Sequence, residues 1–115
     1  MNIVHVTSHL NIGGVTSYVL AVSRGLHARG HRVSIVSGGG ERAAILAKEG
    51  IAHWQAPLHT SAEFGLSVWR AKRQLVQQLR TQRVDILHAH TRVGQVVAAY
   101  LARKLRIPYV TTWHG

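Results

Sequence analysis

The residues best suited to chemistry lie in short segments that follow runs of β-branched residues. Two adjacent glycines, Gly13 and Gly14, separate the first such run from a stretch of helical period. Glycines at this point let the backbone approach an anion, and the helix that follows would direct its free N–H groups and the positive end of its dipole at that anion. The pair therefore predicts a phosphate-binding turn. A tight turn that merely needs a positive φ is the alternative interpretation.

A second group of candidates stands at the end of the fourth β-branched run. His88 and His90 stand two apart, so on a strand both would face the same side and could share a metal ion. The chain has no cysteine, and Asp85 is the one carboxylate nearby, so a third ligand is missing and the sequence predicts no metal site. We instead expect His88 to be a hydrogen-bonded core residue, like His5. His90 and Arg92 are expected to emerge where a substrate could contact them.

The last candidate is His114, which stands beside Gly115 at the carboxyl end of the fifth β-branched run. A histidine at the mouth of a strand, next to a glycine that permits close approach, is suited to direct contact with a substrate. A loop histidine without such a role is the alternative interpretation.

Two common nucleotide motifs are missing from the chain. A dinucleotide site would need G-x-G-x-x-G with an acidic residue at the end of the second strand, and a P-loop would need G-x-x-x-x-G-K-[ST]. Neither pattern occurs in the chain. The second β-branched run ends at Val36-Ser37-Gly38, without an acidic residue. Hydride transfer and ATP hydrolysis are therefore excluded, and we expect no cofactor. The three glycines at residues 38–40 predict a flexible connector, with a second anion nest as the alternative.

These candidates must be positioned by an α/β fold. Short β-branched runs alternate with longer segments of helical period, which predicts βαβ units and a doubly wound, Rossmann-like parallel sheet covered on both faces. The expected strands are residues 3–7, 32–37, 51–55, 84–88 and 109–112. The expected helices are a first one from residue 15 to a stop at Gly30, then residues 41–49, 64–83 and 91–106. Ligands of such sheets bind outside the carboxyl ends of the strands, where the strand order reverses.

Size and charge restrict the class of protein further. A chain of 115 residues with 46% apolar and 16% charged residues supports one folded core. Its 14 Lys and Arg against 4 Asp and Glu give a net charge of +10, which favours an anionic partner such as phosphate groups, nucleic acid or an acidic membrane. We expect no nucleic-acid partner, because the chain contains no helix-turn-helix, RNP-type or zinc-finger signature.

The helix expected at residues 64–83 is amphipathic and basic. Trp69 and Val76 lie beside its apolar stripe among basic residues, as in a helix that rests on anionic headgroups, and a solvated basic face is the alternative. The sequence shows no secretion signal and no apolar stretch of the roughly 20 residues that span a bilayer. We expect a cytoplasmic protein whose membrane contact, at the inner face, would be peripheral.

Four segments together resemble one enzyme family. Asn11-Ile12-Gly13-Gly14, G-H-x-V-x-I-V at residues 30–36, V-D-I-L-H-A-H at residues 84–90 and I-P-Y-V-T-T-W-H-G at residues 107–115 resemble, in order and spacing, the N-terminal domain of family 4 glycosyltransferases. The resemblance covers essentially the whole chain.

The resemblance implies a GT-B architecture, in which an N-terminal Rossmann-like domain mainly holds the acceptor and a second domain holds the nucleotide-sugar donor. Residues 1–115 would then be a truncated acceptor-side domain that lacks its donor-binding partner domain. The implied reaction moves a sugar from a nucleotide diphosphate to an acceptor hydroxyl, possibly lipid-linked, with retention and without an essential metal. Gly13 and Gly14 would lie against the donor diphosphate, and His114 near the reacting carbon.

The second domain of the family, with its E-x7-E glutamates, does not occur in these residues, so we expect the chain by itself to be inactive. A binding module for anionic lipid or a partner subunit, without catalysis, is the alternative function.

Overall fold

The computed structural model describes residues 1–58 and 66–112. In that part of the chain, five parallel strands form one sheet in the order β3-β2-β1-β4-β5. The strands are β1 (Asn2–Val6), β2 (Arg32–Ser37), β3 (Ala52–Gln55), β4 (Ile86–Ala89) and β5 (Tyr109–Thr111). The helices are α1 (Gly14–Ala28), α2 (Ala44–Lys48), α3 (Leu66–Arg80) and α4 (Arg92–Leu105). The expected α/β class and Rossmann-like doubly wound sheet are confirmed.

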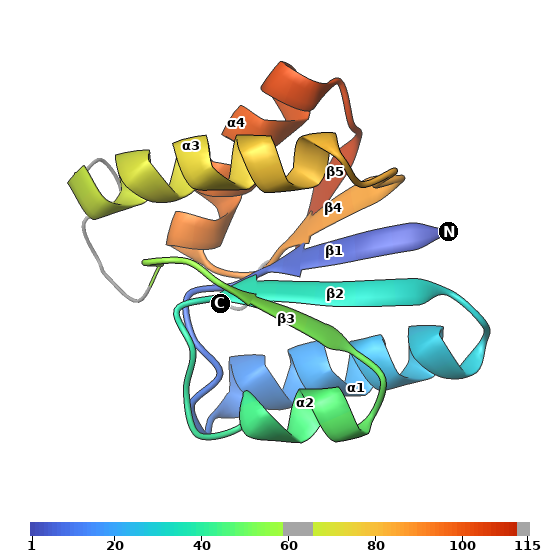
Figure 1. Cartoon of the computed structure of the whole chain (residues 1–115). Helices are drawn as coiled ribbons and strands as arrows, with labels where there is room; N and C mark the ends of the chain where they lie inside the picture. Colours follow the sequence, from blue (N-terminus) through green and yellow to red (C-terminus); the bar gives the residue numbers. More distant parts are fainter. Residues whose placement is uncertain (59–65, 113–115) are drawn as a thin grey trace.

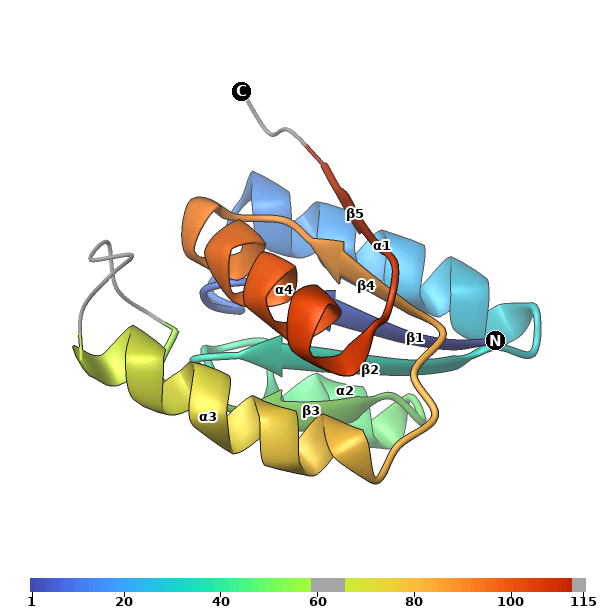
Figure 2. The same ribbon diagram turned by 90° about the horizontal axis from the view of Figure 1, so that it is seen from above.

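The helices cover the two faces of the sheet in pairs. Helices α1 and α2 lie on one face and α3 and α4 on the other, as Figures 1 and 2 show from two directions. From β1 the chain steps outward to β2 and β3, and then returns to the other side of β1 to form β4 and β5. The strand order therefore reverses between β1 and β4, and the carboxyl ends of these two strands mark the place where such sheets bind ligands.

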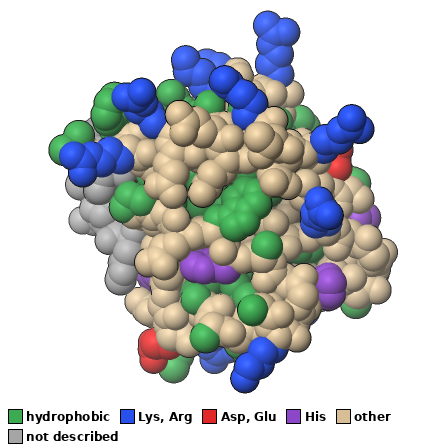
Figure 3. Space-filling view, viewed as in Figure 1, with side chains coloured by type: hydrophobic (Ala, Val, Ile, Leu, Met, Phe, Trp, Pro, Cys, Tyr) green, Lys and Arg blue, Asp and Glu red, His purple; other side chains and the backbone are tan. Residues whose placement is uncertain are grey.

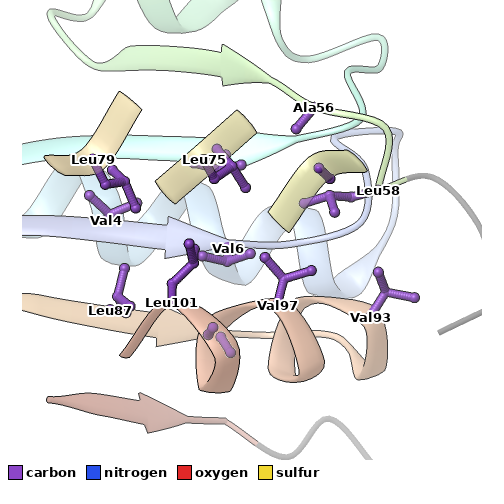
Figure 4. Packing of buried hydrophobic residues seen from close by; sticks show 14 of the residues in the cluster. Val4, Val6, Ala56, Leu58, Leu75, Leu79, Leu87, Val93, Val97 and Leu101 are labelled. Carbon is purple, nitrogen blue, oxygen red and sulfur yellow. The ribbon is translucent and has the colours of Figure 1, made fainter. Parts of the chain in front are cut away.

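The apolar core has two parts, one under each pair of helices. The larger part lies between the sheet and α3 and α4, where Leu75 and Leu101 face Val4, Val6 and Leu87 of the central strands (Figure 4). All five side chains have 0% exposure, so burial of this layer holds α3 and α4 on the sheet. The smaller part lies under α1 and α2 and contains Leu10, Val19, Leu20, Val33, Ile35, Leu46 and Ile51.

Several element boundaries differ from those expected. Strand β4 begins at Ile86 rather than at residue 84, because Asp85 is used before the strand: its N–H donates to Asn2 O at 2.8 Å and its carboxylate accepts from Asn2 N at 2.6 Å. Helix α2 has only five residues, Ala44–Lys48, where we expected nine over residues 41–49.

The buried residues of α1 include the polar Thr16 and Ser23 beside Val19. In the described part of the chain, none of the helices is both long and apolar enough to span a bilayer.

Candidate functional site

The loops that follow β1 and β4 meet at the carboxyl edge of the sheet. Ser8, in the loop after β1, donates a hydrogen bond from Oγ to Thr91 Oγ1 at 2.8 Å. Thr91 is the N-cap of α4, and the same oxygen accepts from Gly94 N at 3.1 Å. The two loops that flank the strand-order reversal are therefore joined by one hydroxyl, which fixes the start of α4 beside the end of β1.

Gly94 allows α4 to approach β1 this closely. A Cβ added to Gly94 would lie 2.6 Å from Val6 O, which is far inside van der Waals contact. The backbone of β1 and the first turn of α4 thus touch at a point where no larger residue fits. Gly94 is not among the site residues expected from the sequence, because a glycine within a helical segment carries no signal of a close backbone approach.

The glycine turn is open on its outer side. Gly13 is extended, with φ 164°, and Gly14 begins α1, so neither glycine adopts a left-handed conformation. A Cβ added to either residue would have no heavy atom of the described residues within 4 Å, its chain neighbours aside. The interpretation of a tight turn that needs a positive φ is therefore wrong. Neither φ nor packing against the described residues requires glycine at these two positions.

The start of α1 has the electrostatic character of an anion site. No side chain of the described residues caps this helix, and its first turn contains no acidic residue. The first N–H groups of a helix lack partners inside the helix and carry the positive end of its dipole. Gly13 and Gly14 therefore place an accessible backbone and a positive partial charge at the same point.

The loop after β2 supports the glycine turn from behind. Leu10 N donates to Gly39 O at 2.9 Å, and Arg42 N donates to Leu10 O at 2.9 Å. A Cβ on Gly40, whose φ is 149°, would lie 2.5 Å from the backbone carbon of Leu10. The glycines at residues 38–40 are thus hydrogen-bonded and packed against the loop after β1, which differs from the expected flexible connector. Whether they also form an anion nest remains a prediction.

A cluster of three histidines, His5, His88 and His90, lies at the junction of β1 and β4. His5 Nδ1 and His90 Nε2 are hydrogen-bonded at 2.8 Å. The ring centroids are 5.0 Å apart for His5 and His88, 5.0 Å for His5 and His90, and 4.1 Å for His88 and His90. His88 Nε2 is also hydrogen-bonded to Thr112 Oγ1 at 2.6 Å, which connects the cluster to the end of β5.

The parallel register of β1 and β4 creates the cluster. His5 pairs with His88 in register, and side chains alternate between the two faces along a strand. The neighbours Val4 and Leu87 point toward α3 and α4, so His5 and His88 point toward the α1 face. Tyr18 of α1 packs edge-on against His90, with 5.7 Å between the ring centroids.

Burial keeps His5 uncharged. The side chain has 0% exposure, and this desolvation, together with the nearby His88, lowers the pKa of His5 from 6.5 to about 3. The His5 imidazole is therefore neutral across the physiological range, with a lone pair available on one ring nitrogen.

The structure reverses the expected environments of His88 and His90. His90, expected in the open loop, is 2% exposed, whereas His88, expected in the core, is half-buried. The reason is that His90 N still donates to Val6 O at 3.0 Å, which keeps the residue in line with the sheet and beneath Tyr18. Arg92 is exposed at the first position of α4. The substrate contacts expected of His90 and Arg92 remain predictions, and His114 and Gly115 lie outside the described residues.

The basic face of α3 lies away from the glycine turn, over the other side of the sheet. Leu66 and Trp69 are 62% and 51% exposed, and the Arg73 guanidinium lies 5.0 Å from the Trp69 ring centroid. Val76 instead packs against the core. On the face seen in Figure 3, most of the visible Lys and Arg side chains lie in the upper half, over α3 and α4.

A five-stranded parallel sheet with helices on both faces defines the broad class of Rossmann-like α/β domains. Within that class, the family model for Glycosyltransferase Family 4 matches residues 12–115, which is most of the chain. The chain belongs to Glycosyltransferase Family 4.

Solved structures show the same fold at low sequence identity. A glycosyltransferase from Rickettsia africae superposes with a TM-score of 0.79 at 20% identity, and HepE from Anabaena, solved with UDP and glucose, with a TM-score of 0.75 at 19% identity. They match 98% and 100% of this chain, which spans 30% of the length of each. The C-terminal domain of a Pyrococcus furiosus hydrogenase also superposes, with a TM-score of 0.69 at 15% identity. The match covers 97% of this chain and 90% of that domain. The fold alone therefore does not define the chemistry. No curated protein sequence matches the chain.

Proposed function

We propose that this chain is the acceptor-side domain of a retaining glycosyltransferase that moves a sugar from a nucleotide diphosphate to an acceptor hydroxyl. One observation carries the proposal: Gly13 and Gly14 stand at the uncapped start of α1, beside the strand-order reversal, and neither φ nor packing against the described residues requires them to be glycine. A ligand that approaches the backbone supplies the missing reason.

The proposed chemistry uses the backbone rather than an acidic side chain. Charge develops on the diphosphate as it leaves the sugar, and N–H groups held at a helix start stabilise that charge without reorganising. In this proposal His114 contacts the transferred sugar, and Arg92, exposed at the start of α4, contributes positive charge near the acceptor. In this proposal the donor-binding second domain completes the site. Residues 1–115 by themselves would then bind substrate but would not transfer the sugar.

The experiment compares two glycines of the same helix in the complete enzyme. Gly14→Ala adds one methyl group at the open turn, and Gly25→Ala adds the same group at a position of α1 that also has no described heavy atom within 4 Å. Turnover is measured with a panel of nucleotide sugars that begins with UDP-glucose, because the HepE structure contains UDP and glucose.

We expect Gly14→Ala to lower kcat/KM about 100-fold, since a small displacement of the diphosphate is enough for such a loss. Gly25→Ala should leave kcat/KM unchanged. Equal activity of the two variants would refute the assignment of the glycine turn to the donor.

The exposed part of α3 favours contact with a membrane. In the proposed transferase this contact would bring the domain to a membrane-proximal acceptor, and in the alternative function it would be the whole activity of a lipid-binding module. Trp69 and Leu66 offer apolar surface beside Arg73, as in helices that rest on anionic headgroups. We expect the protein to bind vesicles that contain phosphatidylglycerol and not neutral vesicles, with a shift in Trp fluorescence. The double variant Arg70→Glu, Arg73→Glu should abolish that binding. If it binds as the wild type does, the membrane role of α3 is refuted.

A further inference from the structure

We propose that His5, His88 and His90 form a binding site for a divalent transition-metal ion of the zinc class. One ring nitrogen from each of the three residues lies within 4.8 Å of the others. The pair His88 and His90 lacks a third ligand in the linear sequence, and the parallel register of β1 and β4 supplies it, because His5 stands opposite His88. This inference is independent of the proposed transfer reaction.

The spacing of the nitrogens suits coordination with little movement. Three imidazole nitrogens at 2.0–2.1 Å from a tetrahedral Zn²⁺ are separated from one another by about 3.3 Å. The hydrogen-bonded pair, His5 Nδ1 and His90 Nε2, is 2.8 Å apart, and no pair of ligand nitrogens exceeds 4.8 Å. The required separation lies between the 2.8 Å distance and the 4.8 Å upper limit, so the three nitrogens are close enough to share one ion.

Exchange of the existing hydrogen bond for metal ligands balances in protons. His5 Nδ1 and His90 Nε2 share one proton in the 2.8 Å hydrogen bond between them. Coordination by both nitrogens would replace this N–H···N bond, and the displaced proton would move to the other nitrogen of the same ring. Both imidazoles would therefore stay neutral, as metal-binding histidines must be.

The donor set determines the class of ion. Three neutral imidazoles without a carboxylate suit Zn²⁺, Co²⁺, Ni²⁺ and Cu²⁺, whereas Mg²⁺ and Ca²⁺ require oxygen ligands. The hydroxyl of Thr112, 2.6 Å from His88 Nε2, can accept a hydrogen bond from the Nε2–H, and the tautomer that this contact selects has its lone pair on Nδ1. His88 is half-buried, so solvent reaches the cluster at this residue.

The test is a titration of the full chain with Zn²⁺, after treatment with a chelator and without any nucleotide sugar. We expect saturable binding of one ion per chain, a rise in Tm with Zn²⁺ concentration, and visible d–d bands of tetrahedral cobalt when Co²⁺ replaces Zn²⁺.

Two variants and a matched control identify the ligands. His88→Ala should weaken Zn²⁺ binding at least 100-fold, and Thr112→Val, which acts through His88, about tenfold. The control is His53→Ala, which removes another partly buried strand histidine that contacts Ser37 instead of the cluster. Circular dichroism confirms that each variant is folded.

Two results would overturn the site. One is weak binding of several ions that His88→Ala does not change, as expected of scattered surface histidines. The other is an equal loss of affinity in His53→Ala and His88→Ala. Failure of sugar transfer in the donor experiment would not alter either readout, because no nucleotide sugar is present in the titration.

Discussion

Replacement of Gly94 by alanine tests the packing of α4 against β1 at the candidate site. The new Cβ would lie 2.6 Å from Val6 O and 3.0 Å from Thr91 Oγ1. Alanine improves helix propensity by up to about 1 kcal/mol over glycine, but overpacking a close contact costs about 1–3 kcal/mol. The backbone of β1 lies in the centre of the sheet and cannot withdraw, so the second effect outweighs the first. We expect a net loss of about 1–2 kcal/mol.

Gly25→Ala is the control, because a Cβ at this helical position has no described heavy atom within 4 Å. It should stabilise the protein by up to about 1 kcal/mol. Urea unfolding followed by circular dichroism measures both variants, and Tm should move in opposite directions by roughly 4–8 °C per kcal/mol. If Gly94→Ala is as stable as Gly25→Ala, α4 does not touch β1 as described and the reasoning fails.

Three further predictions concern pH, the core and the end of the chain. Because the pKa of His5 is lowered to about 3, the unfolded chain binds a proton at His5 below pH 6.5, whereas the folded protein binds it only near pH 3. The contribution of His5 to the free energy of unfolding is therefore complete above pH 6.5 and falls as the pH drops. With a chelator present we expect a loss of about 2 kcal/mol between pH 7 and pH 5; His5→Val should remove this loss, and a loss that persists would show that His5 is not its cause. Leu75→Ala should cost about 2–5 kcal/mol in urea unfolding because it leaves a cavity under α3, whereas the exposed Leu66→Ala should change stability by less than about 0.5 kcal/mol; similar values would contradict the core assignment. In the complete enzyme, His114→Ala should lower kcat with little change in Tm, and parallel losses would make the residue structural.

The hydrophobic periodicity of the sequence predicted the fold well, because it determines which segments form strands and which form helices. Alternation of β-branched runs with helical stretches requires a parallel sheet with two covered faces, and all five strands and four helices occur in the expected order. Boundaries were less predictable, because they depend on contacts between distant segments. Strand β4 starts late, for example, because Asp85 pairs with the backbone of Asn2, 83 residues away in sequence.

The candidate site could be predicted only where one short segment carries it. The glycine turn is visible in the sequence as a doublet before a helix. The histidine cluster is not, since it depends on the register that sets His5 opposite His88, and register is not encoded in either strand alone. The same reason explains the wrong environments expected for His88 and His90, because burial follows from what α1 covers rather than from the end of a strand.

The positive charge available at the candidate site depends on which of its groups are charged at pH 7. His5 is held neutral by burial, so it adds no positive charge to the carboxyl edge of the sheet. The attraction for an anion must come from the uncapped start of α1 and from cations such as Arg92. The net charge of the chain is +10, and the helices within residues 1–58 and 66–112 have no acidic residue in their first turns. Helix-end fields act over one turn, whereas exposed cations are screened by salt beyond about 10 Å. Added salt should therefore slow the arrival of a nucleotide diphosphate more than it weakens the contact with the glycine turn.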